Sequence, residues 1–307
     1  MISEDTRHVV VATDENFVLP TATTLRSLTH HGVGGALQIW VLCTGVSLES
    51  KTAIQDSVTG PLQISWIDMD NVDLGDTSQS TLGKGTYLRL ALGEVLPADV
   101  SSVLYMDVDM LVTDSLAPLW ELPDGGEVAW AVRSVHYPSL CTYGAMDHWP
   151  ELGLDPRAPY FNAGLMMIDM RRWREQHIGR KALDHLASPL ANGALADQEG
   201  LNVALAGRWG ELDPKWNQQS PLLEHNRGAQ LMYDDDTLVA AREKPAVIHY
   251  LSRPKPWHAD CTHPLREDWR RVANETAFGP ITLQSTPLKH EVKWRVKRAA
   301  SALLKGR

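Results

Sequence analysis

Short apolar runs rich in Val, Ile and Trp alternate with polar, helix-like segments along most of the chain. We expect strands at 8–13, 37–43, 62–67, 103–106, 128–132, 163–168 and 246–250, and helices at 21–30, 47–59 and 87–93. Continuous apolar strands that alternate with helices are typical of an α/β protein with a mostly parallel sheet. Pro20 is expected to open the first helix. The stretch after about Leu222, including 233–237, is more polar and is expected to be loop-like.

Two aspartates interrupt this pattern, because Asp107 and Asp109 directly follow the strand expected at 103–106. An ionised carboxylate is costly to bury unless it is paired or bound to a metal. In α/β sheets, ligands bind beyond the carboxyl ends of the strands, and Asp14 and Asn16 follow the first strand at that edge. Two carboxylates leave room for water and phosphate oxygens, which is typical of Mg²⁺ or Mn²⁺ bound to a diphosphate. By themselves they could equally be solvated or capping aspartates.

A second polar cluster, V-I-H-Y-L-S-R-P-K-P-W-H at 247–258, comes late in the chain. His249 ends an expected strand, and Lys255 lies in a loop that prolines make rigid. An imidazole as third ligand would favour Mn²⁺ over Mg²⁺, and Lys255 could neutralise a phosphate. A lone histidine in an apolar strand is also compatible with an ordinary core residue, and the lysine with a simple turn.

Composition narrows the function classes. The 307 residues carry a formal net charge of −9, which argues against a nucleic-acid-binding protein. No G-x-G-x-x-G follows the first strand and no P-loop motif occurs, so the usual dinucleotide and P-loop sites are not indicated. The three scattered cysteines suit a reducing compartment. No signal peptide or membrane-spanning run is evident, so we expect a cytoplasmic protein.

Six ordered blocks carry a resemblance to a known family. They are T-D-E-N-F at 13–17, T-Y-L-R-L-A-L-G-E at 86–94, V-L-Y-M-D-V-D-M-L-V-T-D-S-L-A-P-L-W at 103–120, Y-F-N-A-G-L-M-M-I-D-M-R-R-W at 160–173, A-D-Q-E-G-L-N at 196–202 and H-Y-L-S-R-P-K-P-W-H at 249–258. In order and spacing the chain resembles glycosyltransferase family eight over roughly residues 8–270. That family comprises retaining galactosyl- and glucosyltransferases of bacterial lipooligosaccharide synthesis and is related to glycogenin.

The resemblance implies a GT-A fold, with a Rossmann-like, mostly parallel central sheet and flanking helices, that binds Mn²⁺, or alternatively Mg²⁺. It also implies a UDP-hexose donor, either galactose or glucose, and a glycan or glycolipid acceptor. The implied metal ligands are Asp107, Asp109 and His249. The implied donor-site residues are Ala12, Asp14, Asn16, Phe17, Val108, Asn162, Ser252 and Lys255, together with the two aspartates. Alternatively, Asp14 and Asn16 could merely cap the next helix, and Phe17 could belong to the core.

The resemblance places Arg89, Asn162, Asp197 and Gln198 around the donor sugar. Because an amide is a poor nucleophile, we expect the acceptor to attack from the face that UDP leaves. Glu199 stands where the family commonly has Asp, and could orient the acceptor or replace Gln198 as nucleophile. Ser252 replaces a family glycine, so close approach of the backbone to phosphate is in doubt. The alternatives are a haloacid-dehalogenase-type phosphatase, with Asp234–Asp236 as its second acidic pair, and a non-catalytic binding protein for sugar nucleotides or glycans.

The C-terminal segment differs from the body in charge. Residues 288–307 hold seven basic residues and one acidic residue, a net +6, so the remaining chain carries −15. Apolar positions recur every three or four residues from Leu288 to Leu303, which predicts an amphipathic helix starting at Pro287. We therefore expect a transferase domain at 1–284 and a basic tail at 285–307. The tail could bind an anionic membrane at its inner face, pack back on the body, or be disordered.

Overall fold

The computed structural model describes residues 6–74, 84–192, 195–223, 226–251 and 253–286. Its strands are β1 (Thr6–Asp14), β2 (Ala36–Thr44), β3 (Leu62–Asp68), β4 (Ser102–Met106), β5 (Met110–Val112), β6 (Ala129–Arg133), β7 (Phe161–Asp169), β8 (Trp209–Glu211), β9 (Gln218–Gln219) and β10 (Val247–His249). The α-helices are α1 (Val18–His31), α2 (Leu48–Ser57), α3 (Leu92–Val95), α4 (Met170–Glu175), α5 (Ile178–Leu186), α6 (Asp197–Ala204), α7 (Arg227–Met232), α8 (Asp235–Glu243) and α9 (Arg266–Asn274). Short 3₁₀ helices are η1 (Glu15–Phe17), η2 (Lys84–Ala91), η3 (Ala117–Glu121), η4 (Pro214–Asn217) and η5 (Ser220–Leu223).

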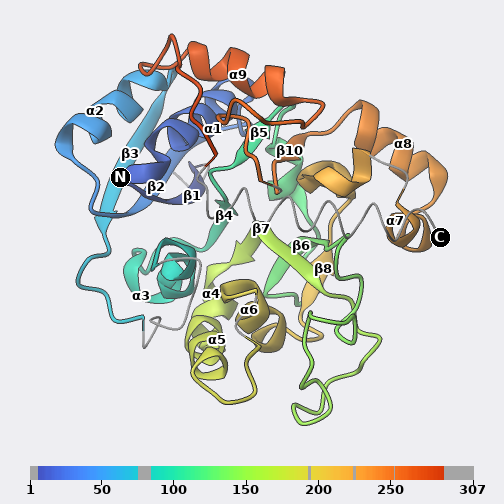
Figure 1. Ribbon diagram of the computed structural model, residues 1–307. Helices are drawn as coiled ribbons and strands as arrows, with labels where there is room; N and C mark the ends of the chain where they lie inside the picture. Colours follow the sequence, from blue (N-terminus) through green and yellow to red (C-terminus); the bar gives the residue numbers. More distant parts are fainter. Residues whose placement is uncertain (1–5, 75–83, 193–194, 224–225, 252, 287–307) are drawn as a thin grey trace.

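A seven-stranded sheet in the order β3-β2-β1-β4-β7-β6-β8 forms the centre of the molecule (Figure 1). β1 pairs in parallel with β2 and β4, β2 with β3, and β6 with β8. Among the strands that the structure describes in this sheet, only β7 departs from this pattern, because it runs antiparallel to both β4 and β6. The predicted α/β class with a mostly parallel, flanked sheet is therefore confirmed.

Alternation along β1 divides the core into two layers. Val9 and Val11 face a cluster that includes Leu25 of α1, whereas Val10 faces the opposite cluster with Leu88 of η2 and Leu201 of α6. All of these side chains are fully buried. Successive residues of a strand point to opposite faces, so a continuous apolar strand requires a helical layer on each side. Figure 1 shows α1 and α2 on one side and α3, α5 and α6 on the other.

The acidic pair lies at a corner between two sheets. β4 ends at Met106, and β5 begins at Met110 in a separate three-stranded sheet of order β5-β10-β9. Within that sheet β10 runs antiparallel to β5, with His249 opposite Met110. This pairing brings the late segment of the chain to the corner that holds Asp107 and Asp109.

Two local predictions were wrong. The polar stretch after Leu222 is not a loop but contains α7 and α8, and the Asp234 carboxylate accepts a hydrogen bond from the Thr237 N–H at 2.7 Å. Aspartates favour both loops and helix N-termini, so their density alone does not separate the two. Helix α1 begins at Val18 rather than after Pro20. The proline fits within the first turn because N–H groups there have no intrahelical acceptor.

None of the helices that the structure describes combines the length and apolar composition needed to cross a bilayer. The predicted tail helix at 287–307 lies outside the described residues.

Candidate active site

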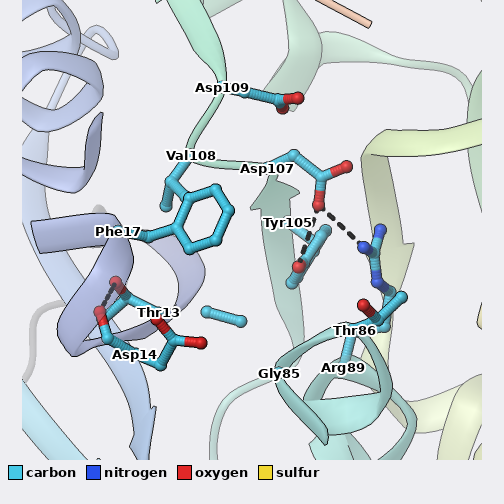
Figure 2. A pocket seen from close by; sticks show the side chains of 11 residues that line it. Thr13, Asp14, Phe17, Gly85, Thr86, Arg89, Tyr105, Asp107, Val108 and Asp109 are labelled. Atoms are coloured by element: carbon cyan, nitrogen blue, oxygen red, sulfur yellow. Dashed lines mark hydrogen bonds and ion pairs between the residues drawn. The ribbon is translucent and has the colours of Figure 1, made fainter. Parts of the chain in front are cut away.

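A cleft of about 210 Å³ opens between the carboxyl end of β1 and the corner after β4 (Figure 2). It is lined by Ala12, Thr13, Asp14, Phe17, Gly85, Thr86, Arg89, Tyr105, Asp107, Val108 and Asp109. Seven of the residues predicted for the site are in this lining: Ala12, Asp14, Phe17, Arg89, Asp107, Val108 and Asp109. The cleft lies where parallel strands of an α/β sheet present their ligand-binding edge.

Backbone hydrogen bonds hold the acidic corner in place. The Asp107 N–H donates to the Gly164 carbonyl of β7 at 2.8 Å, and the Tyr250 N–H donates to the Asp109 carbonyl at 3.0 Å. The Thr24 hydroxyl of α1 lies 2.8 Å from the carbonyl of Val108. The corner is thus tied to the central sheet, to the segment after β10 and to a helix, which fixes the backbone that carries both carboxylates.

Three of the predicted side chains come close enough to share one cation. Asp107, Asp109 and His249 each offer a ligand atom within 4.8 Å of the others. His249 Nε2 lies 3.2 Å from Asp109 Oδ1. Two carboxylates and one imidazole are ligand types that Mn²⁺ accepts, so the donor set fits a divalent cation of this kind.

The two aspartates differ in electrostatic environment. Burial by itself would raise the pKa of Asp109, but Lys255 and His249 outweigh it and hold that pKa well below its usual range. The Lys255 ammonium lies 2.6 Å from Asp109 Oδ2 and also donates to the Tyr250 carbonyl. For Asp107, burial outweighs the nearby Arg89 and raises the pKa. A cation bound at the site would favour ionisation of Asp107.

Arg89 connects the acidic corner to α6. Its Nη2 lies 2.7 Å from Asp107 Oδ1, its Nε 2.7 Å from Asp197 Oδ2, and its Nη1 donates to the Ala163 carbonyl at 2.5 Å. The guanidinium also stacks over the Tyr105 ring, 4.4 Å from its centre. Burial alone would lower the pKa of Arg89, but the two carboxylates raise it. Burial raises the pKa of Asp197 to about 6 although Arg89 opposes the shift.

A chain of side-chain amides connects α6 to β10. Gln198 Oε1 accepts from Asn162 Nδ2 at 3.0 Å, and Asn162 Oδ1 accepts from Asn217 Nδ2 at 2.8 Å. Asn217 Oδ1 in turn lies 2.9 Å from His249 Nδ1. The structure therefore connects two predicted residues of the sugar region with a predicted metal ligand. Asn217 was missed because a polar residue in P-K-W-N resembles any other turn residue.

Glu199 does not join this arrangement. Its carboxylate is fully buried against α5, 3.1 Å from His185 Nε2, and accepts from the Asn192 N–H at 2.8 Å. Neighbouring residues of a helix point in different directions, so Gln198 turns toward β7 while Glu199 turns toward α5. The geometry thus argues against Glu199 as the nucleophile.

The β1 end of the cleft combines capping and lining residues. The Asp14 carboxylate accepts from the Asn16 N–H at 2.8 Å and so caps η1, yet Asp14 also lines the cleft. Phe17 packs edge-on against Trp257, with ring centres 6.1 Å apart, and shows its other side to the cleft (Figure 2). Asn16 is exposed beside the cleft rather than in its lining. Ser252 lies outside the described residues.

The loop that carries Lys255 packs near a histidine that burial keeps neutral. Burial, together with Lys255 and Arg266, lowers the pKa of His263 to about 4. Its Nδ1 accepts from the Leu265 N–H at 3.2 Å, which also requires a neutral ring. Protonation of this ring should therefore oppose folding.

We expect acid to destabilise the protein partly through His263. Between pH 6.5 and about 4 the unfolded chain binds a proton that the folded chain does not, so stability falls as pH falls through this window. After discounting for solvent screening, the contribution is about 1–2 kcal/mol. His263→Gln should flatten the pH dependence of the free energy of unfolding, measured by urea denaturation. His148→Gln, at a partly exposed position, is the control. An unchanged slope in His263→Gln would contradict this assignment.

Comparison with known proteins places the chain in a family. General stress protein A of Bacillus subtilis is 24% identical over 287 residues, covering 92% of this chain and 98% of that protein. The lipopolysaccharide 1,3-galactosyltransferase of Salmonella typhimurium is 23% identical over 220 residues, covering 69% of this chain and 60% of that protein.

Solved structures agree in fold. The galactosyltransferase LgtC, in complex with donor and acceptor sugar analogs, matches with a TM-score of 0.69 and 24% identity over 94% of this chain and 99% of that chain. The bifunctional glycosyltransferase WbbM matches with a TM-score of 0.75 and 20% identity, over 91% of this chain and 51% of that one. These likenesses confirm the predicted GT-A fold. The family model for glycosyl transferase family 8 matches residues 8–261, and the chain therefore belongs to that family of glycosyltransferases.

Proposed function

We propose that this glycosyltransferase moves a hexose, galactose or glucose, from a UDP-sugar to a hydroxyl group of a glycan acceptor with retention at the anomeric carbon. The observation that carries the proposal is the convergence of Asp107, Asp109 and His249 with the buried Lys255 at one cleft. Two carboxylates, an imidazole and an ammonium group suit a divalent cation beside a diphosphate. When bound there, Mn²⁺ or Mg²⁺ would supply positive charge beside the leaving diphosphate.

The other residues of the cleft would bind and orient the donor. Lys255 places a second positive charge where negative charge develops on UDP. Phe17 offers an aromatic face and Asp14 a carboxylate at the β1 end, suited to uracil and ribose. Arg89 and Asp197, paired at 2.7 Å, offer a donor and an acceptor for sugar hydroxyls. Asn162 and Gln198, hydrogen-bonded to each other at 3.0 Å, would complete the sugar region.

Same-face substitution accounts for retention without an enzyme nucleophile. The bond between the anomeric carbon and the UDP oxygen breaks, and the acceptor oxygen bonds to that carbon from the same face. The acceptor proton passes to the departing phosphate oxygen. The Gln198 amide is held by Asn162 and the Ala163 N–H and would orient the sugar rather than attack it.

The test is UDP release from UDP-galactose and UDP-glucose in the presence of glycan acceptors, with Mn²⁺ or with a chelator. We expect release that requires the metal, and an α-linked product by NMR. Binding of UDP-sugar without any release would instead support a non-catalytic protein. Release of inorganic phosphate from phosphomonoesters would support the phosphatase alternative, although one member of its expected second acidic pair, Asp234, caps α8.

We further propose that the chain consists of a transferase domain at 1–284 and a basic tail at 285–307. The tail would bring the transferase domain to an acceptor that is linked to a lipid. The relative from Salmonella typhimurium is by name a lipopolysaccharide galactosyltransferase. Basic residues near an anionic leaflet contribute about 1 kcal/mol each, and this tail carries a net +6.

We therefore expect the full chain to sediment with anionic vesicles at low salt, and a chain that ends at Ser285 to stay in the supernatant. Vesicles of neutral lipid are the control, since they should retain neither chain. Equal binding of both chains to anionic vesicles, or binding of neither, would remove the membrane role.

A further inference from the structure

Asn217 is a fully buried asparagine at the end of η4 that touches two residues of the proposed site. Its amide group bridges Asn162, at 2.8 Å, and His249, at 2.9 Å. Buried amides are retained where both of their ends find partners, since an unpaired end costs about 1–3 kcal/mol. The orientation of this amide follows from its neighbours.

Two backbone N–H groups fix the direction of the chain of amides. The Ala163 N–H donates to Gln198 Oε1 at 3.2 Å, so an oxygen must face β7 and Asn162 must present its NH₂ group to that oxygen. Independently, the Gly164 N–H donates to the other end of the Asn162 amide at 3.1 Å, which must therefore be oxygen. A backbone N–H can only donate, so both contacts give the same orientation for Asn162.

This orientation determines the proton on His249. Because Asn162 Oδ1 can only accept, Asn217 presents its NH₂ group there and its oxygen to His249 Nδ1. A carbonyl oxygen only accepts, so Nδ1 carries a proton. Nε2, which lies 3.2 Å from Asp109 Oδ1, is then the ring nitrogen left to supply a lone pair to a cation bound between the two groups. Which ring nitrogen binds a metal is set by the hydrogen bond that the other makes.

Packing confines the ring as well. A Cβ on Gly164 would lie 2.4 Å from His249 Cε1 and 2.9 Å from Met110 Cε, so the imidazole occupies the space that a side chain would take. The backbone of His249 is paired with Met110 on one side and Gln219 on the other. The ring is therefore fixed in position by β5, β7 and β9, and in proton placement by Asn217.

We propose that Asn217 is a positioning residue that holds His249 in the tautomer with Nδ1 protonated, so that Nε2 can bind the divalent cation. The backbone N–H groups of Ala163 and Gly164 set this tautomer, because they fix the orientation of the Asn162 amide. The inference rests on the proposed metal role of His249. It also joins the cation site to the region proposed for the donor sugar, since the same amides reach Gln198.

The test is the affinity of the full-length protein for Mn²⁺ alone, measured by the EPR signal of the free ion. Asn217→Leu keeps the branched shape of the side chain and removes both hydrogen bonds, and loss of such a partner typically weakens metal binding by about 10–100-fold. The matched control is Gln218→Leu. Gln218 is equally buried and adjacent, but its amide donates to the Ala241 carbonyl of α8 at 2.9 Å. We expect the control to stay within about threefold of the wild type.

Equal Mn²⁺ affinity in Asn217→Leu and the wild type would overturn the role inferred for Asn217 but not the proposed metal role of His249. A wild type that binds no Mn²⁺ would overturn the proposed metal role itself. A second measurement needs no folded variant at Asn217. Long-range ¹H–¹⁵N correlations of ¹⁵N-histidine-labelled wild type, with Mg²⁺ as a diamagnetic cation, report which nitrogen of each ring is protonated. His249→Gln serves only to assign the signal. With Mg²⁺ bound, a ring protonated at Nδ1 and bare at Nε2 supports the inference, and a ring bare at Nδ1 contradicts it.

Discussion

Asp109→Asn is expected to lower transferase turnover by about a thousand-fold or more while the chain stays folded. The carboxylate is one of three groups within 4.8 Å that could hold a cation, and it pairs with Lys255 at 2.6 Å. Losing its charge weakens the positive site at which the diphosphate would leave, and several kcal/mol of lost transition-state stabilisation correspond to this factor. The measurement is kcat for UDP release at saturating Mn²⁺.

Asp68→Asn is the matched control, because Asp68 ends β3 at the same edge of the sheet but is exposed and three strands from β4. It should keep nearly full turnover. In Asp109→Asn the buried Lys255 loses its carboxylate partner, so we also expect a stability loss of about 1–3 kcal/mol. Circular dichroism and urea denaturation separate this loss from the loss of turnover. Near-normal turnover of the folded variant would contradict the role proposed for Asp109.

Arg89→Met is expected to lower the free energy of unfolding by about 3–5 kcal/mol at pH 7. The Arg89 side chain is 7% exposed, and its guanidinium lies 2.7 Å from both Asp107 and Asp197. Its removal therefore leaves the buried Asp197 carboxylate and the partly buried Asp107 carboxylate without this counter-charge. Removing one partner from a buried ionic cluster typically costs this much. Urea denaturation of the variant and of the wild type measures the difference.

The loss in free energy of unfolding caused by Arg89→Met should be smaller at a pH where the carboxylates are protonated. The pKa of Asp197 is about 6 even with Arg89 present, and loss of the guanidinium raises it further. The folded variant therefore takes up protons at a higher pH than the folded wild type does. The difference in the free energy of unfolding between the two proteins should accordingly decrease as pH falls from 7 to 5. Asp197→Asn should likewise reduce the cost in a double-mutant cycle. If the stability loss in Arg89→Met is the same at every pH and also in the Asp197→Asn background, Arg89 stabilises the fold by packing alone.

Local patterns in the sequence were sufficient to predict much of the fold. The apolar runs at 8–13, 37–43 and 62–67 correspond to β1, β2 and β3 within about two residues at each end. They could be predicted because strands buried on both faces need continuous apolar residues, a requirement that each segment meets by itself. The end of β4 at Met106 could be predicted for the same reason, since a carboxylate is costly inside a sheet. The family resemblance then identified the blocks that carry the candidate site.

The sequence by itself therefore determined which segments form strands and which polar residues end them, because hydrophobic periodicity and the cost of burying charge act over a few residues. Only the tertiary structure decided that the D-V-D segment is a corner between two sheets, with β10 paired to β5 from more than a hundred residues away. It also decided that Glu199 faces α5 and that Asn217 reaches His249. Such contacts depend on how whole layers pack, since a side chain's partners are set by elements that local sequence does not specify.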